Sequence, residues 1–219
     1  MNELHQHMIQ APLKEVYRKY LVNSVFASLA TSLFIFFDTL FLGQGVGSAG
    51  LATITFSMPI LLVFSAVSSF MAYGGPSVFA VELGKNNKEG AANVFSLGLN
   101  CAIVSAVACA VLCLLFLKPL CALMGASGEV LPLVTTYVGI LVASQPFMAV
   151  SACLGAYVRN DGQPRLSMIA TIGSNLFNIT FDLLFILVFR WGVAGAAIAT
   201  ALSPLVTIAV LATHFTGGR

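Results

Sequence analysis

The sequence is poor in charge. Only 8% of its 219 residues are Asp, Glu, Lys or Arg, while 58% are hydrophobic. A typical soluble domain has roughly 25% charged residues, and a chain this apolar would expose large hydrophobic patches in water. A bilayer satisfies the same surface, because a spanning helix needs about 20 mostly apolar residues. The composition therefore excludes an ordinary soluble domain and predicts an all-α integral membrane protein.

Several signatures of soluble chemistry are also missing. The sequence has no GxxxxGK[ST] phosphate loop, no HExxH motif and no CxxC pair, and its lysines and arginines form no cluster that favours nucleic acid. Its five cysteines lie in apolar surroundings without a nearby histidine, which favours packing over metal or disulfide. We therefore predict no enzyme activity, no cofactor and no nucleic-acid partner. The cysteines are Cys101, Cys109, Cys113, Cys121 and Cys153.

Six apolar stretches are long enough to cross a membrane. We expect residues 1–15 to form a cytoplasmic tail, residues 16–215 a bundle of six transmembrane helices, and residues 216–219 a truncated C-terminal end. Short connections force neighbouring helices to run antiparallel. The Gly-Gly-Pro sequence before residue 77 should bend or end the second helix. The stretches are Val16–Gly43, Leu51–Leu83, Ala92–Leu117, Leu131–Val158, Leu166–Phe189 and Val193–Phe215.

The positive charges predict the orientation of these helices. Cytoplasmic segments of membrane proteins carry an excess of Lys and Arg. Two of the ten Lys and Arg residues, Lys118 and Arg190, fall on one side of the expected topology, and the other eight fall on the side of both termini. We therefore expect a multi-pass protein of the plasma (inner) membrane with both termini in the cytoplasm.

Two aspartates are the most costly residues to insert into this bundle, Asp38 and Asp182. An Asp at the centre of a membrane helix costs about 2.5–3.5 kcal/mol on insertion scales, so each marks a candidate functional site. Asn175, Asn178 and Asp182 have the i, i+3, i+7 spacing of one helix face. Such a polar stripe faces the bundle interior or a water-filled cavity. The alternative is that each aspartate only accepts a hydrogen bond inside the bundle.

The expected topology brings these groups to one depth. Asp182 lies about 24 Å from the inner start of its helix, and Thr200 about 10 Å below the outer face. Asp38 is late in the first helix, so the carboxylates, the Asn178 amide and the Thr200 hydroxyl would form an oxygen-rich cation site. Such a site suits a hard cation such as Na⁺, or a proton held between two buried carboxylates.

A mechanism follows as a hypothesis. Asp38 and Asp182 alternate between a state loaded with Na⁺ or a proton and an empty state. Loading neutralises the site and permits a helix rearrangement that releases substrate outward. Asn175, Tyr137 and Gln145 are candidates for lining a cavity, and helix packing explains them about as well.

Six short segments occur in a characteristic order along nearly the whole chain: Phe37–Gln44 (FDTLFLGQ), Gly50–Ala52, Met58-Pro59, Arg159–Pro164 (RNDGQP), the Asn178/Asp182 pair and Gly192–Thr200 (GVAGAAIAT). In these segments the sequence resembles the multidrug and toxic compound extrusion (MATE) family. That resemblance implies one half of a twelve-helix transporter, an N-terminal lobe that exports drug-like, often cationic, organic compounds in exchange for Na⁺ or H⁺. It implies a cation site at Asp38, Asn178, Asp182 and Thr200, and a partner that is either a second six-helix lobe or a second copy of the chain.

The chain departs from this family in lacking a proline early in its first helix, so a proline-driven bend is not expected there. Three alternatives remain. A flippase for lipid-linked oligosaccharides shares a related bundle, but no Lys or Arg falls at mid-helix to hold a pyrophosphate. A non-transporting scaffold or channel would show no dependence on an ion gradient. An intramembrane aspartyl protease uses two aspartates, but Phe37-Asp38 and Phe181-Asp182 lack its flanking patterns.

Overall fold

The computed structural model describes residues 12–216, and this part of the chain is helical without a strand. Five helices are long and apolar enough to cross a membrane, and a bent pair of shorter helices supplies a sixth span. The predicted class and number of spans are therefore confirmed. The helices are α2 (Leu13–Gly45), α3 (Ser48–Gly84), α4 (Lys88–Leu115), α5 (Leu117–Leu123), α6 (Val130–Ala143), α7 (Gln145–Asn160), α8 (Pro164–Asp182), the π-helix η1 (Leu183–Val188) and α9 (Gly192–Thr216).

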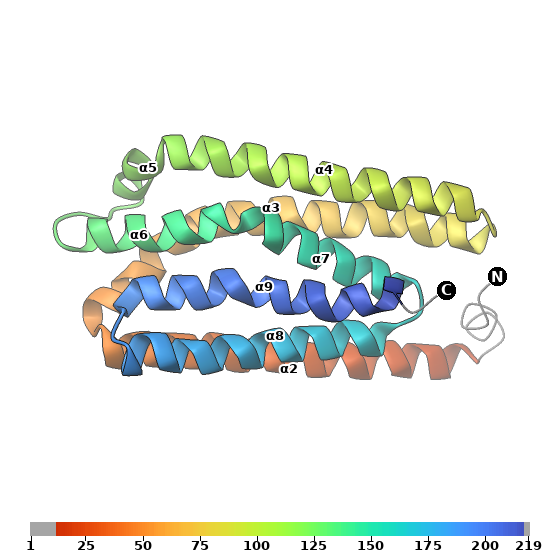
Figure 1. Cartoon of the computed structure of the whole chain (residues 1–219), viewed down its shortest axis with the longest axis horizontal. Helices are drawn as coiled ribbons and strands as arrows, with labels where there is room; N and C mark the ends of the chain where they lie inside the picture. The colour runs from red at the N-terminus through yellow and green to blue at the C-terminus, as the bar shows by residue number, and fades with distance from the viewer. Residues whose placement is uncertain (1–11, 217–219) are drawn as a thin grey trace.

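Short turns with special backbone geometry separate the helices. Gly47, between α2 and α3, has a φ of 76°, and Gly162 before α8 has a φ of 86°. These left-handed conformations suit glycine because it has no Cβ. The Asn87 side chain accepts a 3.0 Å hydrogen bond from the Gly90 N–H and caps the start of α4. Turns this short reverse the chain at once, so consecutive spans run antiparallel (Figure 1).

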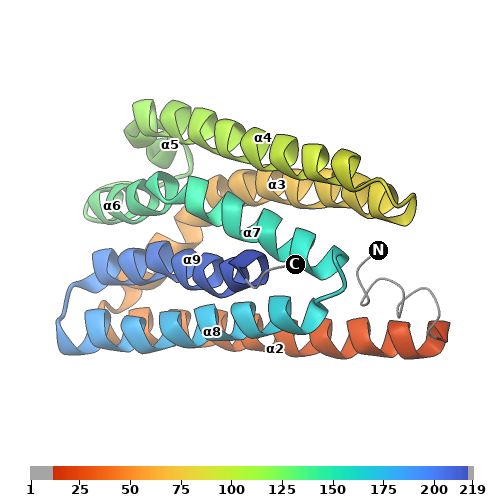
Figure 2. The same ribbon diagram turned by 45° about the vertical axis from the view of Figure 1, so that its right-hand side comes forward.

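The bundle consists of two groups of helices. One contains α2, α8 and α9, with α8 packed against both neighbours, and the other contains α3, α4 and α7. Helices α6 and α7 also pack on α9 and thereby join the groups, as the two views show (Figures 1 and 2). Helix α2 makes little contact with α3. The cavity described below opens between these two groups.

Three details differ from the sequence expectations. Helix α3 runs without a break through Pro59 and Pro76, so the expectation that the second helix could end near Pro76 is wrong. The expected loop after α4 contains a short helix, α5. The fourth span breaks at Ser144, where α6 and α7 meet at 49°, because Pro146 at the start of α7 cannot continue a helical hydrogen-bond ladder.

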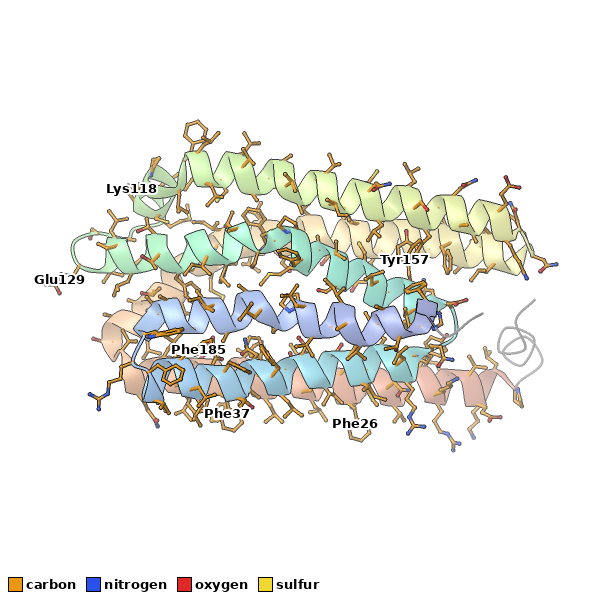
Figure 3. The ribbon with its side chains drawn as sticks, viewed as in Figure 1. Phe26, Phe37, Lys118, Glu129, Tyr157 and Phe185 are labelled. Atoms are coloured by element: carbon orange, nitrogen blue, oxygen red, sulfur yellow. The ribbon has the colours of Figure 1, made fainter. Side chains whose placement is uncertain are left out.

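Lysine and arginine residues concentrate at one end of the bundle. The end of the bundle at which α2 begins, α3 meets α4, α7 meets α8 and α9 ends is called the basic end (Figure 1). Lys118 lies at the opposite end, together with Glu129 (Figure 3). Arg219 is outside the described residues. Seven of the ten Lys and Arg residues belong to the basic end: Lys14, Arg18, Lys19, Lys85, Lys88, Arg159 and Arg165.

Candidate functional site

Two aspartates from different helices meet inside the bundle. Asp38 is on α2 and is 8% exposed, and Asp182 is the last residue of α8 and is fully buried. Their carboxyl groups lie within hydrogen-bonding range of each other. Two carboxyl groups can share a hydrogen bond only when one carries a proton. The pair can therefore hold either a proton or a cation that neutralises both charges.

An amide and a hydroxyl complete the cluster. In the amide orientation that satisfies both ends of Asn178, its nitrogen donates to Asp182 Oδ2 at 2.7 Å. Its oxygen accepts from the backbone N–H of Thr200 at 3.0 Å and from the Thr200 hydroxyl at 3.1 Å. Asn178 is one turn before Asp182 on α8, while Thr200 faces it from α9. The structure thus brings together all four residues that the sequence predicted for the cation site.

The cluster retains unused oxygen atoms. Asp38 Oδ1 and Asp182 Oδ1 are buried and lack a hydrogen-bond partner among residues 12–216. Buried polar atoms are almost always paired, so two such atoms in contacting residues need an explanation. A small cation, or a proton that makes one carboxyl group a donor, would satisfy them. The donor set is all oxygen, which suits Na⁺ or a proton better than a transition metal.

A π-helix begins directly after Asp182. Residues Leu183–Val188 form η1, in which each hydrogen bond spans five residues and not the four of an α-helix. Two glycines let neighbouring helices approach it: a Cβ at Gly45 would overlap the Ile186 side chain, and one at Gly195 would lie 3.0 Å from the Phe185 backbone. The sequence did not predict this π-helix, because the apolar residues that form it fit a π turn and an α turn equally well.

A cavity of about 670 Å³ adjoins the cluster. Asp38 and Thr200 line it, while Asp182 and Asn178 lie behind them in the protein. The volume falls in the range of small-molecule sites, roughly 300–1,000 Å³. All three candidate cavity residues from the sequence also line it: Tyr137, Gln145 and Asn175.

The lining also includes hydroxyl side chains of α8 and α9 that were not predicted from the sequence: Ser167, Thr171 and Ser174 on α8, and Thr207 on α9. The first three continue the spacing of Asn178 and Asp182 toward the start of α8, so the signal was present. Small hydroxyl side chains are common in membrane helices, where they bond to the preceding turn, and a single one carries little information. Their common face becomes visible only when the whole helix is considered.

Six membrane spans around a cavity, with a buried carboxylate pair at its wall, define a helical membrane transporter. The family model described as MatE matches residues 24–184, which is most of the chain. The chain belongs to the MatE family. This membership confirms the resemblance found in the sequence and the expectation of a transporter rather than an enzyme.

Relatives and solved structures agree with this assignment. The chain is 26% identical over 185 residues to the multidrug export protein MepA of Staphylococcus saprophyticus, a match that covers 84% of this chain and 41% of MepA. Its fold matches a MOP superfamily transporter from Pyrococcus furiosus with a TM-score of 0.90 and 25% identity, covering 98% of this chain and 47% of that one. An outward-facing multidrug resistance MATE family transporter matches equally well, with a TM-score of 0.90, 25% identity and the same coverage. The chain therefore spans less than half the length of these proteins.

Proposed function

We propose that this chain is the N-terminal lobe of a cation-coupled antiporter that exports drug-like organic compounds. The observation that carries the proposal is the contact between Asp38 and Asp182, two buried carboxyl groups with unpartnered oxygens at the wall of a cavity. A charged pair of this kind is costly within a bilayer and is retained where ions or protons move.

The coupling ion is Na⁺ or H⁺. Its ligands would be the carboxylates of Asp38 and Asp182, with Asn178 and Thr200 supplying an amide and a hydroxyl oxygen. The Asn178 amide ties α8 to α9, and the Asp38–Asp182 contact ties α8 to α2. Ion binding would therefore change the interactions among three helices at once, which provides a means of coupling it to a helix rearrangement.

The cavity supplies a site for an organic substrate. Phe34, Met58 and Leu61 offer apolar contacts, while Asp38 offers the carboxylate that a cationic compound needs. Substrate and ion would then compete for the same charge. Because substrate and ion compete for Asp38, binding of one displaces the other, as antiport requires, and no further binding residues are needed.

The membrane arrangement is part of the proposal. The basic end would face the cytoplasm of a plasma (inner) membrane, because positive residues concentrate on that side. Since the relatives are about twice as long, a second six-helix lobe or a second copy of this chain would close the cavity. A flippase for a pyrophosphate-linked lipid is less well supported, because the cavity lining carries one carboxylate, Asp38, and one guanidinium, Arg159, and so has no cluster of basic residues to hold that group.

Trp191 offers a direct test of ion binding. Its ring stacks on Phe185 with a centroid distance of 4.9 Å, and Phe185 lies in η1, which continues from Asp182. We would titrate the fluorescence of the purified chain in lipid nanodiscs with Na⁺ at constant ionic strength, and separately with pH. A saturable response is expected in the wild type and should be lost in Asp182→Asn.

The matched control is Glu129→Gln, which removes an exposed carboxylate at the same end of the bundle (Figure 3). It should respond like the wild type. If Na⁺ and pH leave the wild-type fluorescence unchanged, and isothermal titration also detects no binding, the proposed ion site is wrong. Dye efflux should also be measured in cells that express either Asp38→Asn or Asp182→Asn. If efflux stays intact with each variant, the coupling role of the two carboxylates is refuted.

A further inference from the structure

The cavity has two chemically different sides. Around Asp38, helices α2 and α3 contribute apolar side chains such as Phe34, Ile54 and Met58, while further along α3 the lining includes Ser65, Ser68 and Ser69. In contrast, every residue that α8 and α9 contribute carries a hydroxyl or an amide group. We call these six residues the polar wall: Ser167, Thr171, Ser174, Asn175, Thr200 and Thr207.

The polar wall extends far beyond the carboxylate pair. It begins beside Asp182, where Thr200 bonds to Asn178, and reaches Ser167 in the first turn of α8 at the basic end. At 1.5 Å per residue, Ser167 lies about 22 Å along α8 from Asp182. A single ion site needs ligands only from its immediate surroundings. A wall of this length is therefore not explained by the site alone.

Hydrogen bonds leave mainly acceptors on this wall. The Thr171 hydroxyl donates to the Ser167 carbonyl at 3.0 Å, and the Ser174 hydroxyl donates to the Ser203 carbonyl at 2.7 Å. The Asn175 amide nitrogen donates to the Thr31 hydroxyl oxygen at 3.2 Å. Because the protein itself takes up these donors, the lone pairs of the same side chains remain available to ligands in the cavity. Such a surface offers acceptors to cations and to the hydrogens of water. The positive charge in the same lining, Arg159, lies on α7 at the basic end and not on this wall.

We propose that the polar wall is the path by which the coupling cation moves between the basic end and the Asp38/Asp182 pair. The inference rests on the proposed function, since it presumes that the pair binds an ion. The hydroxyl and amide oxygens replace part of the hydration of Na⁺, or hold the water molecules that relay a proton. The apolar residues around Asp38 stay free for the organic substrate, so ion and substrate reach the Asp38 carboxylate, for which they compete, along different parts of one cavity.

A kinetic signature separates a path from a binding site. Residues along a path change the barrier, so association and dissociation rates fall together while the dissociation constant stays constant. We would measure Trp191 fluorescence by stopped flow after mixing the nanodisc-embedded chain with Na⁺, or after a pH jump if the titration identifies a proton. In Ser167→Ala/Thr171→Val both rates should fall about tenfold, the equivalent of one lost hydrogen bond to the passing ion.

Two variants control this experiment. Thr180 is also on α8 and donates the same type of bond, to the Leu176 carbonyl at 2.8 Å, but it is exposed on the outside of the bundle. Thr180→Val should therefore keep wild-type rates, and so should Thr171→Ser, which retains the hydroxyl. Equal thermal stability of the variants would show that folding is unaffected.

The outcomes are distinct. Unchanged rates in Ser167→Ala/Thr171→Val would overturn the path, while the ion site would stand. A weakened dissociation constant in that variant would also overturn it, because the residues would then belong to the site or its support. A wild type that binds neither ion, by Trp191 fluorescence and by isothermal titration, would refute the proposed function itself, and the path with it.

Discussion

Two polar clusters in the interior of this bundle differ in whether their polar atoms have hydrogen-bond partners. At the cluster around Tyr157, the hydroxyl donates to the Val94 carbonyl at 3.2 Å, and nearby the Asn160 amide donates to the Pro76 carbonyl at 2.8 Å. At the Asp38/Asp182 cluster, one oxygen of each carboxyl group lacks a partner among the described residues. The Tyr157 cluster is toward the basic end, and Asp182 immediately precedes the helix that carries Phe185 (Figure 3).

This difference distinguishes two roles of buried polar groups in a membrane protein: one joins helices, and the other binds a ligand. A satisfied group joins helices and specifies their packing, at a cost already offset by its hydrogen bond. An unsatisfied pair destabilises the protein until a ligand arrives, so it is retained only where ligand binding matters. Tyr157 also packs edge-on against Phe79 and Phe95, with ring centroids 5.2 and 4.9 Å away, which makes its position rigid. The comparison predicts that mutations at the two clusters affect stability in opposite directions.

The largest effect is expected at the Tyr157 cluster. A Cβ at Gly75 would overlap the Tyr157 hydroxyl, so Gly75→Ala should lower the free energy of unfolding by about 1–3 kcal/mol, the usual range for overpacking. Thermal unfolding in detergent measures the change. Gly74→Ala is the control, because no atom from outside its own stretch of helix lies within 4 Å of the Cβ position, so it should only gain the helix propensity of alanine, about 0.5–1 kcal/mol.

A second substitution tests the cause. Tyr157→Phe removes the overlapping hydroxyl, and the next ring atom, Cζ, lies 3.4 Å from the Gly75 Cβ position, an ordinary contact. The double variant Gly75→Ala/Tyr157→Phe should therefore be more stable than Gly75→Ala alone. If the second change only adds to the loss, the overlap is not the reason for the glycine.

Much of this architecture was predictable, because lipid imposes a simple rule on length and composition. Six apolar stretches gave six spans, and Asp38, Asn178 and Asp182 stood out since charged and amide groups in lipid are rare. Thr200 was predicted from its depth in the expected topology and from the family resemblance, because a single hydroxyl carries little information. It was harder to predict which face of each apolar helix packs against protein and which contacts lipid. Lipid and protein interior are equally apolar, so a membrane helix has no strong hydrophobic period.

The missed features follow from the same rule. The π-helix η1 and the short helix α5 have apolar sequences that fit several helical geometries. The full length of the polar wall was missed because Ser and Thr in membrane helices satisfy themselves on the preceding turn, as Thr171 does. Of the prediction that the segment at Pro76 would bend or end the second helix, the end is wrong, since an isolated sequence does not reveal whether neighbouring helices tolerate a proline.

A smaller effect of opposite sign is expected at the carboxylate cluster. Asp38→Asn and Asp182→Asn each replace a carboxylate with an amide that can donate to the remaining one. Each should raise the ion-free free energy of unfolding by about 1–2 kcal/mol, since an unpaired buried group is removed. Thermal unfolding should also show that Na⁺ or acid stabilises the wild type, as any ligand of the folded state does, and stabilises neither variant.

The double variant sharpens this test. Both substitutions relieve the same contact, so their effects should not add, with a coupling of at least about 0.5 kcal/mol. Glu129→Gln, remote from the pair, should add to either one. Additive gains from Asp38→Asn and Asp182→Asn would mean that the two carboxylates do not interact in solution, and the comparison between clusters would lose its basis.

The smallest effect concerns Tyr157→Phe alone, and it decides whether the clusters are independent. The variant loses one long hydrogen bond and leaves the Val94 carbonyl in its helical bond, so the loss of stability should be about 0.5–1 kcal/mol. Tyr17→Phe, which removes an exposed hydroxyl, should change nothing. The Trp191 response to Na⁺ or pH should keep its midpoint in both variants, because the bonds of Tyr157 are to α4 and not to the carboxylate pair. A shifted midpoint in Tyr157→Phe would show that the α3–α4–α7 group moves when the ion binds, and that satisfied polar groups take part in the transport cycle.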